Sequence, residues 1–330
     1  MKKCVVIGSN AFSGQDFVDL LLSETDWHVI GTSRSVEKSD FFLRYKSNPN
    51  KGRFVFQRFD LNGDQDAMLA MLDSEKPEYI VNFAAQSEVG PSWEHPEHWF
   101  QTNAVSQARF VNHMRRQNYL ERYLHVSSPE AYGNCVGTVT ETTPDNPSTP
   151  YAASKAAADN INSVYQKTFN FPALTVRATN VYGARQQLFK IICRAVIYIK
   201  LGKTIKLDGG GTAVKSYINM RDVSAGELAM LQRGRVGERY HLSPDNGIAV
   251  KDVVRIIAER MGTSLEAVSE IGPERPGQDA AYVIDSSKAR SEFGWSPKIS
   301  MEEGLSEVVS WIEANWEAIR KEELAYVHKA

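Results

Sequence analysis

The first half of the chain alternates short runs of β-branched and aromatic residues with segments whose apolar residues recur every three or four positions. Such runs predict strands, and the spacing between them predicts amphipathic helices. Repeated strand–helix–strand order predicts right-handed crossovers and a parallel sheet with helices on both faces. The predicted strands are Cys4–Gly8, His28–Thr32, Phe54–Phe56, Tyr79–Ala84, Tyr123–Ser127 and Ala173–Arg177.

A loop bounded by glycines joins the first predicted strand to the first predicted helix. Glycines at such a turn let backbone N–H groups and the helix N-terminus approach a pyrophosphate. The middle glycine of the usual pattern is replaced by Ala11, so an ordinary strand–turn–helix explains the loop almost as well. Its place at the start of a strand–helix series favours dinucleotide binding and a Rossmann-type doubly wound α/β fold. The candidate contacts are Gly8, Asn10, Ala11, Phe12, Ser13 and Gly14.

The end of the second predicted strand, Thr32-Ser33-Arg34-Ser35, bears on the choice of dinucleotide. A carboxylate at this place would accept hydrogen bonds from the ribose hydroxyls of NAD. A guanidinium instead suits the 2′-phosphate of NADP, which it can bind through two N–H groups. Ser33 and Arg34 therefore favour NADP over NAD as a tightly held cofactor. A solvated loop arginine is the competing interpretation.

The strand–helix rhythm ends after about Tyr182, which divides the chain. We expect residues 1–181 to form the dinucleotide-binding domain, with a return of about 216–242 to it. Residues 182–330 are expected to form mainly a smaller C-terminal substrate-binding lobe at the carboxyl ends of the strands, where open α/β folds bind ligands. In this lobe the sequence predicts a glycine loop, two helices and a fixed turn: 209–211, Val250–Met261, Met301–Glu323 and Pro273–Gly277.

Composition excludes several classes of protein. The 330 residues carry 38 basic and 40 acidic side chains, a balance that argues against a nucleic-acid binder. No run of about 18 apolar residues predicts a membrane span, and the apolar N-terminal run is too short for a secretory signal. The three cysteines, Cys4, Cys135 and Cys193, have no CxxC or histidine-rich spacing, so we expect no disulfide framework and no metal. These features predict a cytoplasmic protein.

Tyr151 and Lys155 lie four residues apart at the start of an alanine-rich predicted helix. This spacing places both side chains on one helical face, where an ammonium can stabilise a tyrosinate. The pKa of the phenol would then fall from about 10 towards working pH. A tyrosinate can take a hydroxyl proton while hydride leaves the carbinol carbon. The pair is common by chance, so its value depends on its context.

The context is Val126–Gly133, a run that leaves the fifth predicted strand about two dozen residues earlier. With it the chain resembles the extended short-chain dehydrogenase/reductase family, in its nucleotide-sugar epimerase and dehydratase branch. The resemblance covers essentially the whole chain. It rests on Gly8–Gly14, Asp60-Leu61, Asn82–Ser87, Thr102-Asn103, Ser128 with the Tyr151/Lys155 pair, Arg177–Gly183 and Arg275–Asp279.

The resemblance implies a role for residues that composition and spacing leave unassigned. On the cofactor side it places Asp60 and Leu61 against the adenine, followed by Ala84, Ala85 and Gln86. On the side of the nucleotide sugar it implies Ser87, Asn180, Lys190, Lys215 and Arg275. Cations and an amide donor suit a diphosphate. A solvated helix face explains Lys190 and its neighbour Arg194 equally well.

Glu130 separates the members of this branch. The 4-epimerases need only tyrosine, lysine and serine, because they oxidise C4 and return hydride to its other face. The 4,6-dehydratases are similar to this chain in carrying a glutamate two residues before a Tyr-Gly pair. Such a carboxylate can remove the C5 proton, which a C4 ketone acidifies, as the C6 hydroxyl leaves. Hydride then returns to C6, which regenerates the cofactor within the cycle and leaves a 4-keto-6-deoxy sugar.

The resemblance therefore implies a nucleotide-sugar 4,6-dehydratase. Its expected catalytic residues are Tyr151, Lys155, Ser128 and Glu130. A carboxylate that merely caps a loop is the competing interpretation of Glu130.

Pro129 departs from the pattern, since many TDP-glucose dehydratases have an aspartic acid there that resembles a general acid for the departing O6. Proline has no proton to give, although it favours an extended Ser128. Three donors stay open: Glu130 acting twice, a bound water, or a side chain such as Tyr132 or Ser87. Smaller departures are Ala178 and Ala184, where the family often has proline, and Lys215, where it often has arginine.

Three other functions compete. UDP-glucuronate decarboxylases also resemble this chain in their glutamate and in starting with C4 oxidation. A 4-epimerase would leave Glu130 without a chemical role. A non-catalytic dinucleotide-sensing regulator on the same fold would tend to lose the tyrosine or the lysine, and both are present.

The nucleotide base and the hexose stay open. The chain is similar to TDP-glucose dehydratases overall, while Ser33-Arg34 and Gln86-Ser87 resemble GDP-mannose 4,6-dehydratases. The segments Gly8–Gly14, Phe83–Val89, Ser92–Trp99 and His328-Lys329 resemble dehydratases that act on GDP-N-acetylglucosamine. By analogy with the family we expect a homodimer, or a dimer of dimers, formed by the helices after Ser92 and after Tyr151.

Overall fold

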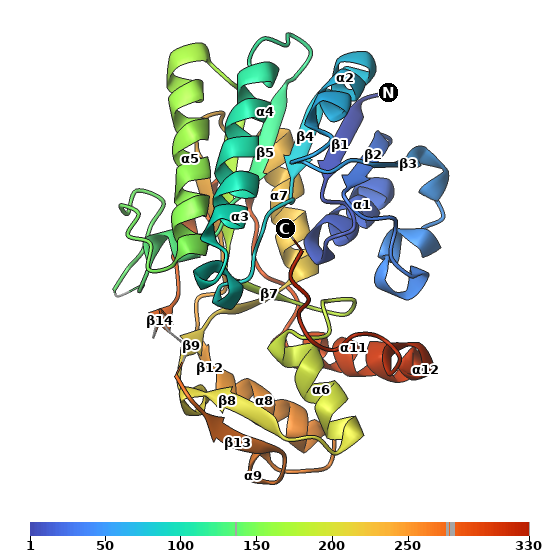
Figure 1. Cartoon of the computed structure of the whole chain (residues 1–330), viewed down its shortest axis with the longest axis vertical. Coiled ribbons are helices and arrows are strands. Elements are labelled where there is room, and N and C mark those ends of the chain that lie inside the picture. Colours follow the sequence, from blue (N-terminus) through green and yellow to red (C-terminus); the bar gives the residue numbers. More distant parts are fainter. Residues whose placement is uncertain (136, 275–276, 278–280, 330) are drawn as a thin grey trace.

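Seven parallel strands form one central sheet in the computed structural model, which describes residues 1–135, 137–274, 277 and 281–329 (Figure 1). Their order is β11-β6-β5-β4-β1-β2-β3, a doubly wound arrangement in which strand order reverses between β1 and β4. The strands are β1 (Lys3–Ile7), β2 (His28–Ser33), β3 (Phe54–Arg58), β4 (Tyr79–Asn82), β5 (Arg122–Val126), β6 (Ala173–Ala178) and β11 (Arg239–Leu242). The predicted parallel Rossmann-type sheet is thus confirmed.

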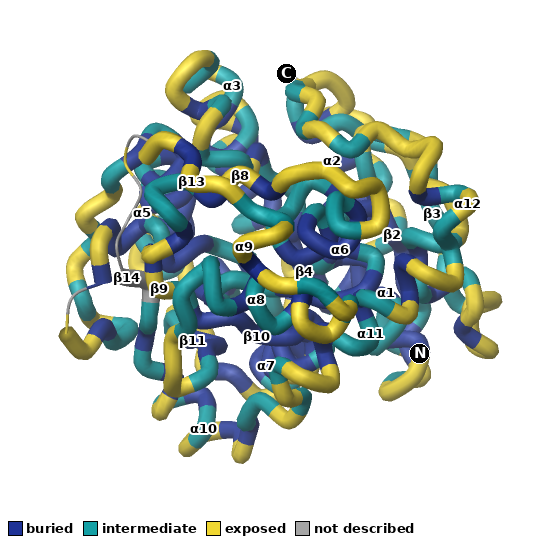
Figure 2. The backbone as a smooth tube through the Cα atoms, turned by 90° about the horizontal axis from the view of Figure 1, so that it is seen from below, coloured by how far each residue is buried: buried dark blue, intermediate teal, exposed yellow. Residues whose placement is uncertain are grey.

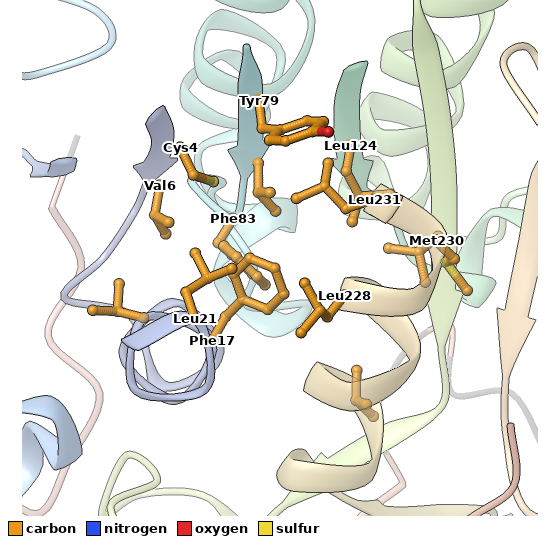
Figure 3. Packing of buried hydrophobic residues seen from close by; sticks show 14 of the residues in the cluster. Cys4, Val6, Phe17, Leu21, Tyr79, Phe83, Leu124, Leu228, Met230 and Leu231 are labelled. Carbon is orange, nitrogen blue, oxygen red and sulfur yellow. The ribbon is translucent and has the colours of Figure 1, made fainter. Parts of the chain in front are cut away.

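Alternate residues of β1 point to opposite faces of the sheet, as the two-residue period of a strand requires. Cys4 and Val6 pack against α1 (Phe12–Glu24) and α7 (Met220–Arg233) in one core (Figure 3). Val5 and Ile7 belong to a second core on the other face. The helices over that face are α2 (Gln65–Glu75), α4 (Ser106–Met114) and α5 (Pro150–Phe169).

The start of α5 is fixed by local chemistry. Thr149 has an extended backbone, and its hydroxyl accepts a hydrogen bond from Ala152 N at 3.1 Å. Pro150 follows at the first helical position, where its missing N–H costs no helical bond. Because Tyr151 comes directly after this capped start, its side chain emerges near the carboxyl edge of the sheet.

A continuous helical segment packs against α5. It consists of α3 (Pro96–Phe100), a π-helical turn (Gln101–Val105) and α4. Such a wide turn inside a helix displaces its side chains relative to a regular helix, and it often lies at a functional site. This turn contains Asn103, which is buried.

The second lobe has a core of its own, built on α6 (Ile191–Leu201), α8 (Val250–Arg260) and α11 (Met301–Ala314). α6 packs directly against both α8 and α11, and Figure 2, which views the molecule from below, shows these helices among exposed turns. The lobe also contains short strands: β7 (Asn180–Tyr182) with β10 (Tyr217–Asn219), β8 (Ile205–Asp208) with β13 (Ser269–Gly272), and β9 (Val214–Lys215) with β12 (Ile248–Ala249) and β14 (Ala281–Tyr282). Its shorter helices are α9 (Leu265–Val268) and α12 (Trp316–Ile319), whereas α10 (Ser287–Phe293) packs against α7 and β11 in the core of the main sheet.

The helix predicted over Met301–Glu323 is divided in two. It breaks at Asn315, between α11 and α12, where the side-chain amide donates to Trp311 O at 2.8 Å. Such a local side-chain bond satisfies a terminal carbonyl and competes with the helical pattern. The Trp311 indole donates to Phe41 O at 3.0 Å, and this bond connects the segment between β2 and β3 to the second lobe.

One strand from the second half of the chain, β11, belongs to the main sheet. β11 pairs in parallel with β6, from Arg239 beside Thr175 to Leu242 beside Ala178. The preceding helix, α7, packs against α1 and covers β5 and β6. The division of the chain at residue 181 stays a prediction, and the turn predicted at Pro273–Gly277 lies partly outside the described residues.

None of the helices in the described ranges is long and apolar enough to cross a bilayer. All three cysteines are buried, and they form no disulfide among the described residues. Burial raises the pKa of the Cys193 thiol to about 12, so packing is the role its surroundings support.

Candidate active site

A cleft of about 400 Å³ opens at the carboxyl edge of the sheet, between the main sheet and the second lobe. Open α/β folds bind ligands at this edge, where strand order reverses. Eleven of the residues predicted to act or to bind line this cleft. They are Ala11, Phe12, Ser13, Ala85, Ser87, Ser128, Glu130, Tyr151, Lys155, Asn180 and Lys190.

The glycine-bounded loop is pressed against the sheet. Gly8 N donates to Thr32 O at 2.7 Å, and Gly8 has a φ of +88°. A Cβ at Gly8 would lie 2.8 Å from Ala84 N, and one at Gly14 would lie 2.2 Å from Gly8 O. Both contacts are with backbone and cannot relax, so these two positions require glycine.

The first turn of α1 leaves its backbone N–H groups available. Ala11 occupies the N-cap position with an extended backbone, and no described side chain caps the helix there. The first turn carries no acidic residue, and Ala11, Phe12 and Ser13 line the cleft. Uncapped N–H groups at the positive end of a helix fit the pyrophosphate of a dinucleotide.

Asn10 forms hydrogen bonds within the protein and is not among the residues that line the cleft. Its side-chain amide donates to Val36 O at 2.8 Å and to Ser35 O at 3.1 Å. Its backbone N donates to Ser33 Oγ at 3.0 Å. These bonds join the glycine loop to the end of β2.

Arg34 follows β2 and is exposed. Its guanidinium donates to the backbone carbonyl of Lys329 at 3.3 Å. The next carboxylate along the chain, Glu37, accepts hydrogen bonds from Tyr45 Oη at 2.7 Å and from Lys46 Nζ at 2.8 Å. Both hydrogen bonds hold the Glu37 carboxylate on its own segment, so it does not replace the ribose-binding carboxylate that is missing from the end of β2.

Ser128 and Glu130 leave β5 on a short 3-10 turn (Pro129–Tyr132). Ser128 is extended, at φ −144° and ψ 136°, as the following proline predicts. Ser128 Oγ accepts a hydrogen bond from Glu130 N at 3.3 Å, and the Ser128 side chain is hydrogen-bonded to Tyr151. The turn thus presents serine, glutamate and tyrosine to one cleft.

The pKa of Tyr151 is raised, in contrast to the lowering that its spacing from Lys155 predicts. Burial is the largest cause and the negative charge of Glu130 the second, while the hydrogen bond with Ser128 acts in the opposite direction. Tyr151 is 8% exposed, so its phenolate has little access to water. The phenol therefore needs further positive charge before it can ionise near neutral pH.

Lys155 is fully enclosed, with 2% of its surface exposed. Its ammonium donates to Val126 O at 2.8 Å. The pKa of Lys155 is lowered to about 8, with burial as the largest cause; the negative charge of Asp159 opposes the lowering, and the positive charge of Arg177 adds to it. The lysine therefore titrates within the range in which enzymes usually work.

Asp159 and Arg177 form a buried ion pair behind the lysine that sequence reasoning did not assign to the site. Arg177 Nη2 lies 2.6 Å from Asp159 Oδ2, and Ser127 Oγ donates to the same oxygen at 2.7 Å. His125 lies beside the pair, and burial lowers its pKa to about 3, so its ring is neutral. The signal for Asp159 was its position one helical turn after Lys155, on the same face of α5.

Asn103, on the π-helical turn, holds the loop after β4 in place. Its side-chain Oδ1 accepts from Gln86 N, and its Nδ2 donates to Gln86 O, both at 2.9 Å. The same Nδ2 lies 2.9 Å from Ser154 Oγ on α5. Asn103 thus positions the Ala85–Ser87 wall of the cleft relative to the helix that carries Tyr151.

Glu227 is a cleft residue that sequence reasoning missed. It lies on α7, is 1% exposed, and neither of its carboxyl oxygens has a hydrogen-bond partner among the described residues. Burial first, and then Asp16, raise the pKa of this carboxyl well above its usual range. The sequence did contain a sign of this burial: Glu227 comes four residues after the apolar Val223, and this spacing places both on the buried face of α7.

Some predicted residues lie away from the cleft. Asp60 Oδ1 accepts from Asn62 N at 2.7 Å, so this carboxylate closes a turn, and Leu61 packs in the core beneath it. Lys215 lies on β9 and Arg275 falls outside the described residues. Tyr132 Oη lies 2.8 Å from His241 Nε2 and is not among the cleft-lining residues, which removes it as a donor to O6.

Comparison with known proteins identifies the family of the chain. Residues 5–308 match the family model described as GDP-mannose 4,6 dehydratase. The dTDP-glucose 4,6-dehydratase of Xanthomonas campestris is 31% identical over 279 residues, 79% of this chain and 79% of that protein. The enzyme of that name from Mycolicibacterium smegmatis is 30% identical, over 95% of this chain and 94% of its own.

Solved structures show the same relationship. The dTDP-glucose 4,6-dehydratase of Streptomyces venezuelae, solved with NAD bound, has a TM-score of 0.88 at 27% identity, over 96% of this chain and 98% of its own. The NAD complex of the Bacillus anthracis enzyme has a TM-score of 0.86 at 28% identity, with the same coverage. The chain therefore belongs to the GDP-mannose 4,6-dehydratase family, in the nucleotide-sugar 4,6-dehydratase branch of the short-chain dehydrogenases/reductases.

Proposed function

We propose that this protein is a nicotinamide-dependent nucleotide-sugar 4,6-dehydratase. It converts a nucleoside-diphosphate hexose into the 4-keto-6-deoxy sugar. The observation that carries the proposal is the meeting of Ser128, Glu130, Tyr151 and Lys155 at one cleft, beside an uncapped helix N-terminus. An epimerase needs only three of these four residues, whereas elimination of water needs the carboxylate as well.

The residues on the sheet side of the cleft fit a nicotinamide dinucleotide. Its pyrophosphate would lie on the N–H groups of Phe12 and Ser13, which Gly8 and Gly14 allow to approach closely. The bound nicotinamide supplies the capacity to accept a hydride from C4 and to return it to C6. The related structures bind NAD. We infer a preference for NADP here from Ser33 and Arg34, with NAD as the alternative.

The first step assigned to the chain is removal of the C4 hydroxyl proton by Tyr151. Ser128, which is hydrogen-bonded to Tyr151, orients the same hydroxyl. Lys155 provides the nearest buried ammonium and lowers the cost of the phenolate, a role the positive charge of an oxidised nicotinamide would reinforce. This explains how a tyrosine whose pKa is raised in the free protein serves as a base.

The second step belongs to Glu130. With C4 a ketone, the C5 proton is acidic, and the Glu130 carboxylate removes it as the C6–O bond breaks. Pro129 provides no proton and Tyr132 does not line the cleft, so three sources remain for the proton that O6 takes. These are Glu130 itself, which has just received a proton, a bound water, and Ser87, which lines the cleft.

The second lobe would hold the nucleoside diphosphate. Asn180 and Lys190 line the cleft from this side, and Lys190 Nζ lies 2.6 Å from Oε1 of Glu88, the residue after Ser87 of the opposite wall. A cation bridging the two walls suits a diphosphate laid between them. We assign the substrate as a nucleoside-diphosphate hexose, with thymine, uracil and guanine nucleotides as the bases to test.

We also propose a homodimer formed through α4 and α5. These helices pack side by side, and apolar side chains are exposed on α5 and at the end of the π-helical turn before α4: Val164 by 57%, Phe169 by 46% and Val105 by 54%. An exposed apolar surface of this kind favours association. Sedimentation of the wild type as a monomer would contradict it, and a larger species would indicate a dimer of dimers.

The decisive experiment incubates the purified protein with UDP-, TDP-, GDP- and CDP-hexoses, including GDP-N-acetylglucosamine, and measures products by mass spectrometry. Loss of one water from one of them is the expected result. UDP-glucuronate serves as the test for decarboxylation, since release of CO2 would replace this proposal. Tyr151→Phe should abolish product, and full activity of that variant would remove Tyr151 from the role of base. Binding of dinucleotide without turnover of any sugar by the wild type would instead indicate a non-catalytic sensor.

A further inference from the structure

A segment near the C-terminus runs from the second lobe back to the main sheet. Residues 324–329, which we call the strap, follow α12 and lie beside α3 (Figure 1). Leu324 packs at the edge of the second-lobe core, and the Tyr326 ring meets Phe189 of that lobe edge-on, with their centroids 5.4 Å apart. The strap therefore begins on one lobe and reaches the other.

His328 fixes the strap on α3. Its ring stacks on the fully buried Trp99, with centroids 5.1 Å apart and an interplanar angle of 11°. His328 Nε2 lies 2.9 Å from His98 Nδ1, so one of these ring nitrogens donates a hydrogen bond and the other accepts it. Tyr326 Oη lies 3.2 Å from the other nitrogen of the His328 ring. Both nitrogens and the face of the ring are thus engaged, which sets the position of the residue that follows.

That residue, Lys329, joins two strands of the main sheet. Its backbone carbonyl accepts hydrogen bonds from Gln86 Nε2 at 2.5 Å and from Arg34 Nη1 at 3.3 Å. Arg34 follows β2 and Gln86 lies on the loop after β4, and β1 lies between these two strands in the sheet. The two bonds therefore connect β2 to β4 across the end of β1, where the glycine-bounded loop begins.

This position suits retention of a cofactor. The pyrophosphate of a dinucleotide is expected on the loop after β1, and Arg34 and Gln86 are both expected to contact the dinucleotide. In the proposed dehydratase cycle the hydride taken from C4 returns to C6, so the dinucleotide needs no exchange between turnovers. A cover that stays closed therefore does not slow turnover, whereas loss of the dinucleotide would stop it.

We propose that the strap is a latch that closes over the bound dinucleotide and retains it between turnovers. Tyr326 and His328 hold the latch on the two lobes, and Lys329 closes it between β2 and β4. The latch opens when the two hydrogen bonds to the Lys329 carbonyl break, as the dinucleotide enters or leaves. The retention rests on the proposed function for its cofactor, whereas the contacts of the strap do not.

The test measures release of bound dinucleotide from the full-length protein. NADH or NADPH is bound, and its fluorescence is followed after mixing with an excess of the oxidised form. We expect release at least about fivefold faster in His328→Ala and in Tyr326→Ala, because each loses a contact that holds the strap. Val327→Ala is the matched control, since this side chain of the same segment is 58% exposed, and it should release as the wild type does. Equal release rates in the wild type and His328→Ala would overturn the proposal.

The direction of the change distinguishes a latch from an obstruction. Loss of a latch should weaken the equilibrium affinity for dinucleotide by a similar factor, because the effect lies in dissociation. Tighter binding by His328→Ala would instead show that the strap occupies the place of the cofactor, and it would refute the latch. Circular dichroism establishes that the variants are folded.

Hydrogen exchange tests the latch in the wild type alone. Bound dinucleotide should slow amide exchange in the strap, because a closed latch protects its backbone. Exchange that is equally fast with and without dinucleotide would contradict the proposal, whatever the variants do.

These measurements need no sugar substrate, so their outcome is separate from that of the dehydratase assay. A protein that dehydrates no sugar, but whose dinucleotide is released faster in His328→Ala, would keep the latch and lose the dehydratase. An active dehydratase whose release rate ignores the strap would lose the latch alone. A wild type that binds no dinucleotide would refute both.

Discussion

Asp159 accepts two hydrogen bonds from Arg177, from Nε at 3.2 Å and from Nη2 at 2.6 Å, at a place where both side chains are almost completely buried. Removing one partner of such a pair leaves an uncompensated charge in a medium that solvates it poorly. The pair lies directly behind Lys155 and influences the pKa of its ammonium. It therefore joins the stability of the fold to the chemistry of the cleft.

Asp159→Asn should destabilise the protein by about 3–5 kcal/mol, because Arg177 would lose its buried counter-charge. Denaturant unfolding measures the change. Asp66→Asn is the control, since Asp66 is 86% exposed in its pair with Arg109 and should cost at most about 1 kcal/mol. Equal effects of the two substitutions would show that burial of the ion pair does not matter.

Glu130→Gln should separate oxidation from elimination. The amide keeps the shape of the side chain and cannot accept the C5 proton, so product formation should fall by about 10²–10⁴-fold. Transfer of hydride from C4 should persist, visible as reduced nicotinamide in a single turnover. Exchange of the C5 proton with deuterium from solvent should disappear, and unchanged exchange would remove Glu130 from this role.

The fall of kcat/KM at alkaline pH should be caused by deprotonation of Lys155. Its pKa of about 8 means that the ammonium is present below pH 8 and is lost progressively above it, so kcat/KM should fall on that side. Lys155→Arg keeps its charge at all accessible pH values. This variant should be slower at its optimum and lack the alkaline fall, and a fall that persists would assign it to another group.

Glu227 should make stability depend on pH. A carboxyl whose folded pKa is raised contributes stability that is fully present below the unfolded pKa of about 4.3, and this stability is lost as pH rises through the folded pKa. Glu227→Gln removes that loss, so its advantage over the wild type should grow between about pH 5 and pH 8. Urea unfolding across this range measures it. Glu259→Gln, an exposed change on α8, should show no such trend.

Arg34→Ala should change the choice of cofactor. A charge-assisted hydrogen bond is worth about 1.5–3 kcal/mol, so affinity for NADP should fall by about tenfold or more while affinity for NAD stays level. Binding titrations with both dinucleotides measure the ratio. Lys51→Ala is the control, because it removes an exposed cation from the segment between β2 and β3. It should leave the ratio of NADP to NAD affinity unchanged. Equal affinity of the wild type for NAD and NADP would contradict the inferred preference.

The local parts of this architecture can be predicted from the sequence. Strand and helix periods lie within single segments, and β1, β2 and β6 end within one residue of their predicted positions. The glycine loop and the Tyr151/Lys155 pair are equally local, because a turn or one helical face determines them. The adjoining serine and glutamate follow from the end of β5.

What could not be predicted depends on contacts between distant segments. The Asp159–Arg177 pair exists because α5 lies against β6, and no spacing within the chain reports that neighbour. The expected contact of Asp60 with the adenine stays a prediction, and the hydrogen bond that its carboxylate accepts from Asn62 N was not foreseen. The meeting of His98 with His328 spans 230 positions of the chain. A motif identifies a residue type at a site, but only the fold identifies what surrounds it.

The late return of β11 to the edge of β6 has a consequence for synthesis of the chain. Until Arg239–Leu242 have left the ribosome, the N-terminal half carries an unpaired edge strand. Open edges of this kind recruit strands from other molecules, and domains generally form as units during translation. The edge of β6 therefore stays open to pairing with strands of other chains while the residues of the second lobe are still being added. We expect aggregation of the nascent chain during this interval.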